Sequence, residues 1–124
     1  MLVFDHVGAL VSDLEVAIVE YENLTGAKST APVRVHSQGV VISFVGAVEL
    51  IQPDVDTPLS RLLERGAVFY HGGYRTKDFD NEVGRLQEMS YIVVAEAFHS
   101  EVFGNRRCQF FKNKLGHLIE IIEE

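Results

Sequence analysis

Four ionisable side chains stand in the centres of short apolar runs that are typical of strands: His6, Glu49, His71 and Glu120. Burying ionisable groups without partners is costly, so something must compensate for it. A divalent cation would do so, because two imidazoles and two carboxylates supply nitrogen and oxygen ligands whose combined charge cancels that of the ion. We therefore predict a site for Zn, Ni, Co, Mn or Fe. The alternative is that each is an ordinary strand residue with local partners.

Both residue types repeat along the chain, which favours a shared site. His6 and His71 each precede, by the same seven residues, the aspartate at which the next predicted helix begins. Glu49 and Glu120 each lie in an apolar run that follows a glycine late in their half of the chain. Two half-sites related by a pseudo-two-fold axis require such a pattern. Asp5, next to His6, is expected on the opposite face of its strand because side chains alternate.

The first half contains the predicted order strand, helix, strands. Residues 2–7 form an apolar run rich in strand-forming residues. Ser12 and Glu15 have the spacing of a capping box, and Gly26 stands where a left-handed helix cap is expected. Between them, apolar residues recur at helical spacing: Leu14, Ala17, Ile18, Tyr21 and Leu24.

The second half repeats this order from the strand-like run at 68–71. Asp78 is the predicted cap of its helix, and the apolar positions that follow are Phe79, Val83, Leu86 and Met89. A short connecting helix is predicted over residues 57–66, capped by Thr57, with Pro58 in its first turn and Gly66 at its end.

These elements predict an α+β fold of two tandem βαβββ modules, residues 1–53 and 67–124, that form one eight-stranded curved mixed sheet around a metal cavity. Each module has about 60 residues and one helix, which is too little to bury its sheet alone. We therefore expect residues 1–124 to fold as a single domain.

Composition narrows the possible functions. The 124 residues have a net charge of −7, which disfavours nucleic-acid binding, and no apolar run reaches the roughly 20 residues that a membrane helix needs. Cys108 is the only cysteine, so no intrachain disulfide can form, and we expect it to be a small core residue. The start of the chain lacks the pattern of a signal peptide, which predicts a cytoplasmic protein.

Basic residues are unevenly distributed. Eight of the eleven lysines and arginines fall within residues 61–77 and 106–114. If these two windows meet, they would suit an anionic small molecule; the alternative is scattered solvated charge. The remaining histidines, His36, His99 and His117, lack an internal match and are expected at the surface or in loops, with a place facing the cavity as the alternative for His117, which follows Gly116.

The two-module pattern with His6, Glu49, His71 and Glu120 resembles the vicinal oxygen chelate superfamily over nearly the whole chain. That superfamily includes glyoxalase I, methylmalonyl-CoA epimerase, extradiol dioxygenases, and fosfomycin and bleomycin resistance proteins. Within it the chain is most similar to the epimerases, in these segments: Phe4-Asp5-His6-Val7, residues 37–41, 48–53, 56–58, 104–106 and 118–120.

The resemblance implies one divalent metal ion on the four predicted ligands, a homodimer, and a small anionic thioester as substrate. It implies that Arg106 contacts the acyl or CoA group, with a strand-edge arginine as the alternative. Gln38 is a candidate substrate contact or an exposed turn residue.

Three positions depart from the epimerase pattern. Ile42 stands where the epimerases have a glutamate that serves as one of two bases. Glu49 stands where they typically have glutamine and glyoxalase I has glutamate. Residues 70–73 are Tyr-His-Gly-Gly, where the pattern has His-His-Ile-Ala.

Epimerases and glyoxalases share the removal of a proton α to a carbonyl, with a metal acting as Lewis acid. Glu49 and Glu120 are the candidate bases, and one of them could be a ligand only. Three functions remain open: an epimerase or isomerase of an acyl-CoA thioester, a glyoxalase I-like lactoylglutathione lyase, and a non-catalytic small-molecule binding or resistance protein. An extradiol dioxygenase is disfavoured, because its iron has two histidines and one carboxylate and this chain offers a further carboxylate, Glu49.

Overall fold

The computed structural model describes residues 1–124, which form two compact units. The first unit comprises residues 7–70, and the second comprises residues 1–6 together with 71–124. The divisions fall inside two strands, β1 (Val3–Leu10) and β5 (Phe69–Thr76), so each strand contributes to both units. The expectation of a single domain with modules 1–53 and 67–124 stays a prediction.

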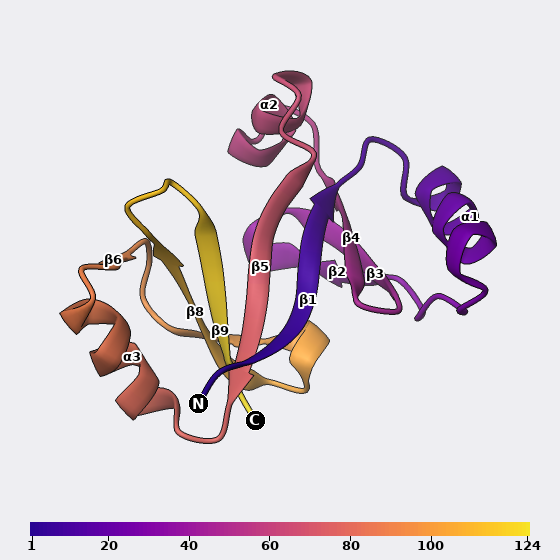
Figure 1. Ribbon diagram of the computed structural model, residues 1–124. Helices are drawn as coiled ribbons and strands as arrows, with labels where there is room; N and C mark the ends of the chain where they lie inside the picture. The colour runs from indigo at the N-terminus through magenta and orange to yellow at the C-terminus, as the bar shows by residue number, and fades with distance from the viewer. The chain divides into compact units, whose positions relative to one another are not determined.

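The first unit contains the last residues of β1, two helices and three further strands. Its elements after β1 are α1 (Leu14–Thr25), β2 (Val33–Val35), a 3-10 turn (His36–Gln38), β3 (Val40–Val45), β4 (Val48–Pro53) and α2 (Pro58–Glu64). The strand order is β2-β3-β4-β1, with β1 parallel to β4 and the other pairs antiparallel. Figure 1 shows α1 alongside β3 and β4. The buried core beneath the helix is Ala9, Leu14, Val45 and Leu50.

Helix capping in this unit differs from the prediction at one end. Asp13 is the N-cap of α1, and its carboxylate accepts a hydrogen bond of 3.2 Å from the backbone N–H of Val16. The predicted capping box at Ser12 and Glu15 is therefore wrong, because the helix begins one residue later than that box requires. The left-handed cap at Gly26 is confirmed, with φ of 74°.

The connecting helix α2 begins as predicted. Thr57 accepts a hydrogen bond from the backbone N–H of Ser60, the Ser60 hydroxyl accepts one from the N–H of Thr57, and Pro58 occupies the first turn. The helix ends at Glu64, and Gly66 follows it with φ of 91°.

The second unit repeats the plan with one more strand. Its elements after β5 are α3 (Phe79–Glu88), β6 (Ile92–Val93), β7 (Phe98–Ser100), a 3-10 turn (Glu101–Phe103), β8 (Arg106–Lys112) and β9 (Leu118–Glu123). The strand order is β5-β9-β8-β6, and β7 also pairs with β8. Strands β5 and β9 are parallel, and the other pairs are antiparallel.

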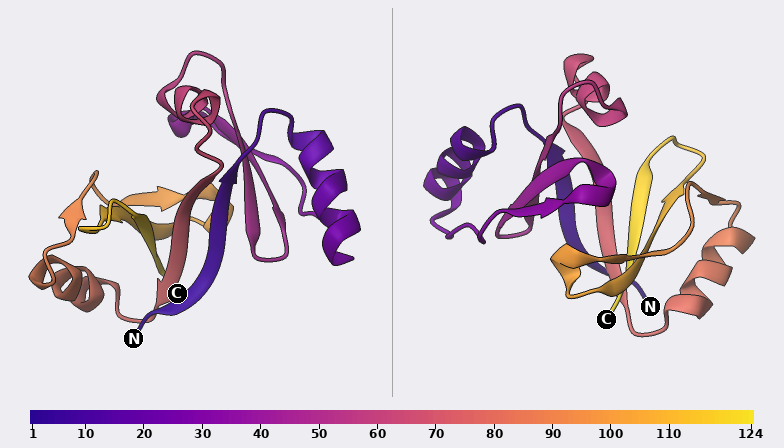
Figure 2. Two further views of the ribbon diagram at one scale, coloured as in Figure 1. Left: turned by 45° about the horizontal axis from the view of Figure 1, so that its top comes forward. Right: turned by 180° about the vertical axis from the view of Figure 1, so that it is seen from behind.

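Helix α3 packs beside β9, as the further views in Figure 2 show. The buried core of this unit is Phe79 and Leu86 of the helix, Phe111 of β8 and Ile121 of β9. Asp78 precedes the helix as predicted, but its side chain makes no capping hydrogen bond. No helix in the chain has the length and apolar character needed to cross a bilayer.

The predicted α+β class, with mixed sheets in βαβββ-like units, is confirmed. The chain has nine strands rather than eight. The additional strand arises because two short segments, β6 and β7, pair separately with β8 where one was expected.

Candidate metal centre

The same strand register places a histidine and a glutamate in each half of the chain. In the first unit, parallel pairing of β1 and β4 sets Gly8 opposite Glu49. In the second unit, parallel pairing of β5 and β9 sets Gly73 opposite Glu120. Each glycine follows a histidine, His6 or His71, by two residues and so shares its face of the strand. The register therefore puts each glutamate on the face of its sheet that carries the histidine.

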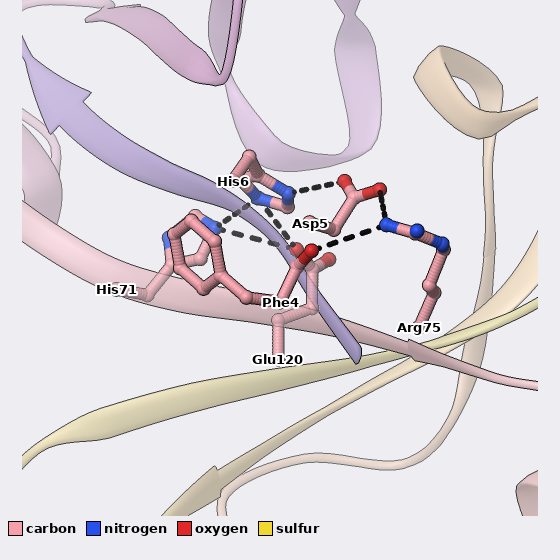
Figure 3. A network of polar contacts seen from close by, with 6 residues as sticks. All are labelled: Phe4, Asp5, His6, His71, Arg75 and Glu120. Atoms are coloured by element: carbon pink, nitrogen blue, oxygen red, sulfur yellow. Dashed lines mark hydrogen bonds and ion pairs between the residues drawn. The ribbon is translucent and has the colours of Figure 1, made fainter. Parts of the chain in front are cut away.

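Three of the four predicted ligands meet within the second unit (Figure 3). Nε2 of His6 lies 3.0 Å from Nε2 of His71, and Oε1 of Glu120 lies 3.3 Å from each of these nitrogens. The exposed fractions are 1% for His6, 6% for His71 and 3% for Glu120. Three ionisable groups are thus buried with their ligand atoms directed at one point, an arrangement hereafter called the triad.

The spacing of the triad fits a bound divalent ion. Two donors that each make a metal bond of about 2.0–2.2 Å, at angles between octahedral and tetrahedral, lie about 2.8–3.6 Å apart. The three separations of 3.0, 3.3 and 3.3 Å fall in this range. Glu120 Oε1 is also buried and accepts no hydrogen bond, which is expensive for a carboxylate oxygen unless a cation is bound beside it. The donor set of two imidazoles and a carboxylate is one that Zn, Fe(II), Co, Ni and Mn accept.

His6 is held in a defined orientation. Its Nδ1 lies 2.8 Å from Oδ2 of Asp5, so the Nδ1–H donates to the carboxylate and the lone pair remains on Nε2, toward the triad. The His6 ring also lies 5.4 Å from the ring of Phe103, tilted by 33°. The contact between Asp5 and His6 was not expected from the sequence, because alternating side chains of a strand point to opposite faces.

Glu49 is the predicted ligand of the first unit. It is 3% exposed and lies within β4, opposite Phe44 of β3 as well as Gly8 of β1. Like the triad residues, Glu49 is buried and offers a ligand atom, in its case a carboxylate oxygen.

The other predicted site residues lie at the surface of their own units. Gln38 ends the 3-10 turn before β3 and is exposed, and Arg106 begins β8 and is exposed. Their predicted role in binding substrate stays a prediction. Ile42 is buried in β3 between Val33 and Ile51, so this position presents only aliphatic neighbours in the sheet.

Two of the eight clustered basic residues are engaged in structural ion pairs. Arg107 bridges Asp80 at 3.0 Å and Glu123 at 2.8 Å, and its guanidinium lies 4.4 Å from the centre of the Phe79 ring. The hydrogen bond from Arg107 holds the pKa of Glu123 below its usual range. Arg75 lies 3.5 Å from Oδ1 of Asp5 and 3.6 Å from Oε1 of Glu124. The other six clustered basic residues are exposed and could contact an anion: Arg61, Arg65, Lys77, Arg106, Lys112 and Lys114.

Residues predicted to lie outside the site do so. His36, His99 and His117 are all exposed, and Cys108 is fully buried in β8 as a core residue.

Comparison with known proteins identifies the family. Residues 5–110 match the model of the Glyoxalase/Bleomycin resistance protein/Dioxygenase superfamily. The chain belongs to this superfamily. The match includes three of the predicted ligands, and the fourth, Glu120, follows it in β9. No curated protein sequence matches the chain.

Several solved structures share the fold closely. Methylmalonyl-CoA epimerase from Mycobacterium tuberculosis has 27% identity and a TM-score of 0.84, over 97% of this chain and 86% of the other. A methylmalonyl-CoA epimerase in complex with methylmalonyl-CoA and NH4+ has 18% identity and a TM-score of 0.85, over 100% and 95% of the two chains. A hypothetical protein from Bacillus halodurans has 19% identity and a TM-score of 0.87, over 99% and 94%. At these identities the last two establish similarity of fold alone.

Proposed function

We propose that this protein binds one divalent metal ion through His6, His71, Glu120 and Glu49 and abstracts a proton α to the carbonyl of an acyl-CoA thioester, as a methylmalonyl-CoA epimerase-like enzyme. The observation that supports it most strongly is the triad, in which two imidazole nitrogens and a buried carboxylate oxygen lie 3.0–3.3 Å apart. Burying three ionisable groups together is costly, and a bound cation would offset that cost.

The repeated register supports Glu49 as the fourth ligand. Glu120 ligates from the position opposite Gly73, two residues beyond His71, and Glu49 holds the corresponding position opposite Gly8, two residues beyond His6. A pair of half-sites built by the same strand pairing would supply one histidine and one glutamate each. Both glutamates are buried, as inner ligands should be.

A bound divalent ion would act as a Lewis acid toward the substrate carbonyl and lower the energy of the enolate. The chain itself must supply the base, within reach of the α-carbon. Glu49 and Glu120 are the buried carboxylates of the proposed site. One of them would accept the α-proton, and the other, together with the two histidines, would hold the ion.

The acyl-CoA substrate is supported by similarity to the epimerases, one of them solved with methylmalonyl-CoA. Exposed basic residues in the second unit suit the phosphates of CoA: Lys77, Arg106, Lys112 and Lys114. We propose that Arg106 and Gln38 contact the substrate and that the protein acts as a homodimer in the cytoplasm.

A second candidate, a glyoxalase I-like lyase, is favoured by two specific residues. Glu49 supplies a carboxylate where the epimerases typically have glutamine, and Ile42 removes the glutamate that they use as a base. A hemithioacetal requires proton transfer between neighbouring carbons, for which one carboxylate suffices.

The deciding experiment offers both substrates to the Co²⁺-loaded protein in deuterated water. The proposal predicts deuterium at C2 of methylmalonyl-CoA, detected by mass spectrometry, and background levels from Glu120→Gln. Turnover of the methylglyoxal–glutathione hemithioacetal alone would establish the lyase instead. Inactivity toward both with metal bound would leave the binding function as the only remaining candidate.

A further inference from the structure

We propose that Asp5 and Gly73 are positioning residues for the metal centre: together they fix the tautomer and the orientation in which His6 offers Nε2 to the ion, and Arg75 holds Asp5 in place. This inference rests on the proposed metal-binding function. It assigns a role to residues of the second unit that neither bind the ion nor contact the substrate.

The hydrogen bond between Asp5 and His6 decides which nitrogen is the ligand. A neutral imidazole carries its proton on one nitrogen and its lone pair on the other. The 2.8 Å contact from Nδ1 to the Asp5 carboxylate places the proton on Nδ1 and the lone pair on Nε2, which faces His71 Nε2 and Glu120 Oε1. A carboxylate bonded to the outer nitrogen also raises the basicity of the ligating one.

The His6 ring packs directly against the backbone of Gly73. A β-carbon at Gly73 would overlap three atoms of that ring, Cε1, Nδ1 and Nε2. Any side chain at this position would therefore push the imidazole away from the triad. The neighbouring Gly72 has no such constraint, because a β-carbon there would make only an ordinary 3.6 Å contact with the Tyr74 ring.

Arg75 contacts Asp5 on the side away from His6 (Figure 3). Its Nη1 donates to the carbonyl oxygen of Phe4 at 3.1 Å and lies 3.5 Å from Oδ1 of Asp5. The guanidinium thus contacts both the backbone before Asp5 and the carboxylate itself. Because Arg75 is about one-third exposed, water can partly replace it, so its contribution should be the smaller one.

Another carboxylate–guanidinium pair in the same chain provides a matched control. Arg34 and Asp54 in the first unit form a closer pair, at 3.1 Å, and both are exposed. The hydrogen bonds of this pair join Arg34 and Asp54 to each other and involve no histidine. Removing Asp54 deletes the same chemical group without touching the triad.

The test measures Co²⁺ affinity by chelator competition, together with the visible absorption spectrum of bound Co²⁺. We expect Asp5→Ala to weaken Co²⁺ binding about 10–100-fold, the range found for removing such supporting carboxylates. Asp5→Asn should fall between wild type and Asp5→Ala, since it keeps an acceptor oxygen and loses the charge. Gly73→Ala should weaken binding and alter the spectrum, whereas Gly72→Ala and Asp54→Ala should match wild type.

A metal-free measurement separates this inference from the proposed function. Nitrogen-15 NMR of the His6 ring should show the Nδ1–H tautomer in wild type and a shift toward Nε2–H in Asp5→Ala. Wild type that binds no Co²⁺ would overturn the metal function, while the NMR result would still decide the role of Asp5. Unchanged tautomer and unchanged Co²⁺ affinity in folded Asp5→Ala and Asp5→Asn would overturn the inference.

Discussion

The two parallel strand pairs, β1–β4 and β5–β9, share a register but differ in how their histidines are supported. In both, a glutamate lies opposite a glycine that follows the histidine by two residues. The residue before the histidine is Asp5 in one pair and Tyr70 in the other. Asp5 bonds to His6 Nδ1, whereas the His71 ring packs edge-on against Phe110 at 5.1 Å.

This difference separates what the repeat supplies from what each half adds. Strand pairing alone sets the positions of the ligands, since register fixes which side chains share a face. The strength of each histidine as a ligand then depends on its neighbours, which the repeat does not preserve. We expect His6, with its charged hydrogen-bond partner, to be the more strongly oriented of the two.

The largest effect should follow from removing a histidine. His6→Gln and His71→Gln should each abolish retention of Co²⁺ through dialysis, because a neutral glutamine amide is a weaker ligand than an imidazole nitrogen and leaves the buried Glu120 poorly compensated. Elemental analysis after dialysis measures this loss. His36→Gln, at an exposed histidine, is the control; retention of one equivalent of metal by both triad variants would show that the triad is not the site.

Core truncation tests whether the two units depend on packing to a similar degree. Phe111→Ala in the second unit should lower the free energy of unfolding by about 3–5 kcal/mol and Leu50→Ala in the first by about 2–5 kcal/mol. Both side chains are fully buried. Urea denaturation followed by circular dichroism measures both losses. A loss below about 1 kcal/mol in either variant would mean that its unit is loosely packed.

Gly73 should be the site of an intermediate loss of stability. An added methyl group that collides with the buried His6 ring should cost about 1–3 kcal/mol in metal-free protein, as overpacking does. Gly72→Ala, one residue away in the same strand, should change stability far less. Equal effects of the two substitutions, measured by urea denaturation, would show that the close approach of Gly73 to His6 does not constrain the fold.

The smallest effect should come from the Arg107–Glu123 ion pair, which lies on the surface of the second unit. Because Arg107 lowers the pKa of Glu123 in the folded chain, the pair stabilises the fold above the unfolded-state pKa. That contribution is lost as the pH falls through the lower, folded-state pKa. Arg107→Leu should therefore lower Tm slightly at pH 7, and the difference from wild type should shrink below about pH 4.

A thermal scan of both proteins at several pH values measures this trend. Arg34→Leu, in the exposed pair of the first unit, serves as the comparison. A difference that grows toward acid pH would contradict the assignment of Arg107 as the partner of Glu123.

Much of the site could be predicted from sequence because its residues are chemically conspicuous and repeated. His6, His71 and Glu120 stand in short apolar runs, and burying such groups predicts a common partner such as a cation. The elements around them were also predictable from periodicity and from cap residues such as Gly26 and Thr57.

The rest depended on distances that a sequence does not encode. The choice between Ser12 and Asp13 as the cap rests on a one-residue shift in where α1 begins. The contact from Asp5 to His6 joins neighbouring residues of one strand, whose side chains are expected on opposite faces. The role of Gly73 follows from the position of a ring 67 residues earlier in the chain, which only the folded structure reveals.

X-ray absorption spectroscopy of the Co²⁺-loaded protein tests the central claim most directly. The account predicts one ion per chain, with two imidazole ligands and further nitrogen or oxygen ligands at about 2.0–2.2 Å. An ion without imidazole scattering, or one bound to the sulfur of Cys108, would contradict it.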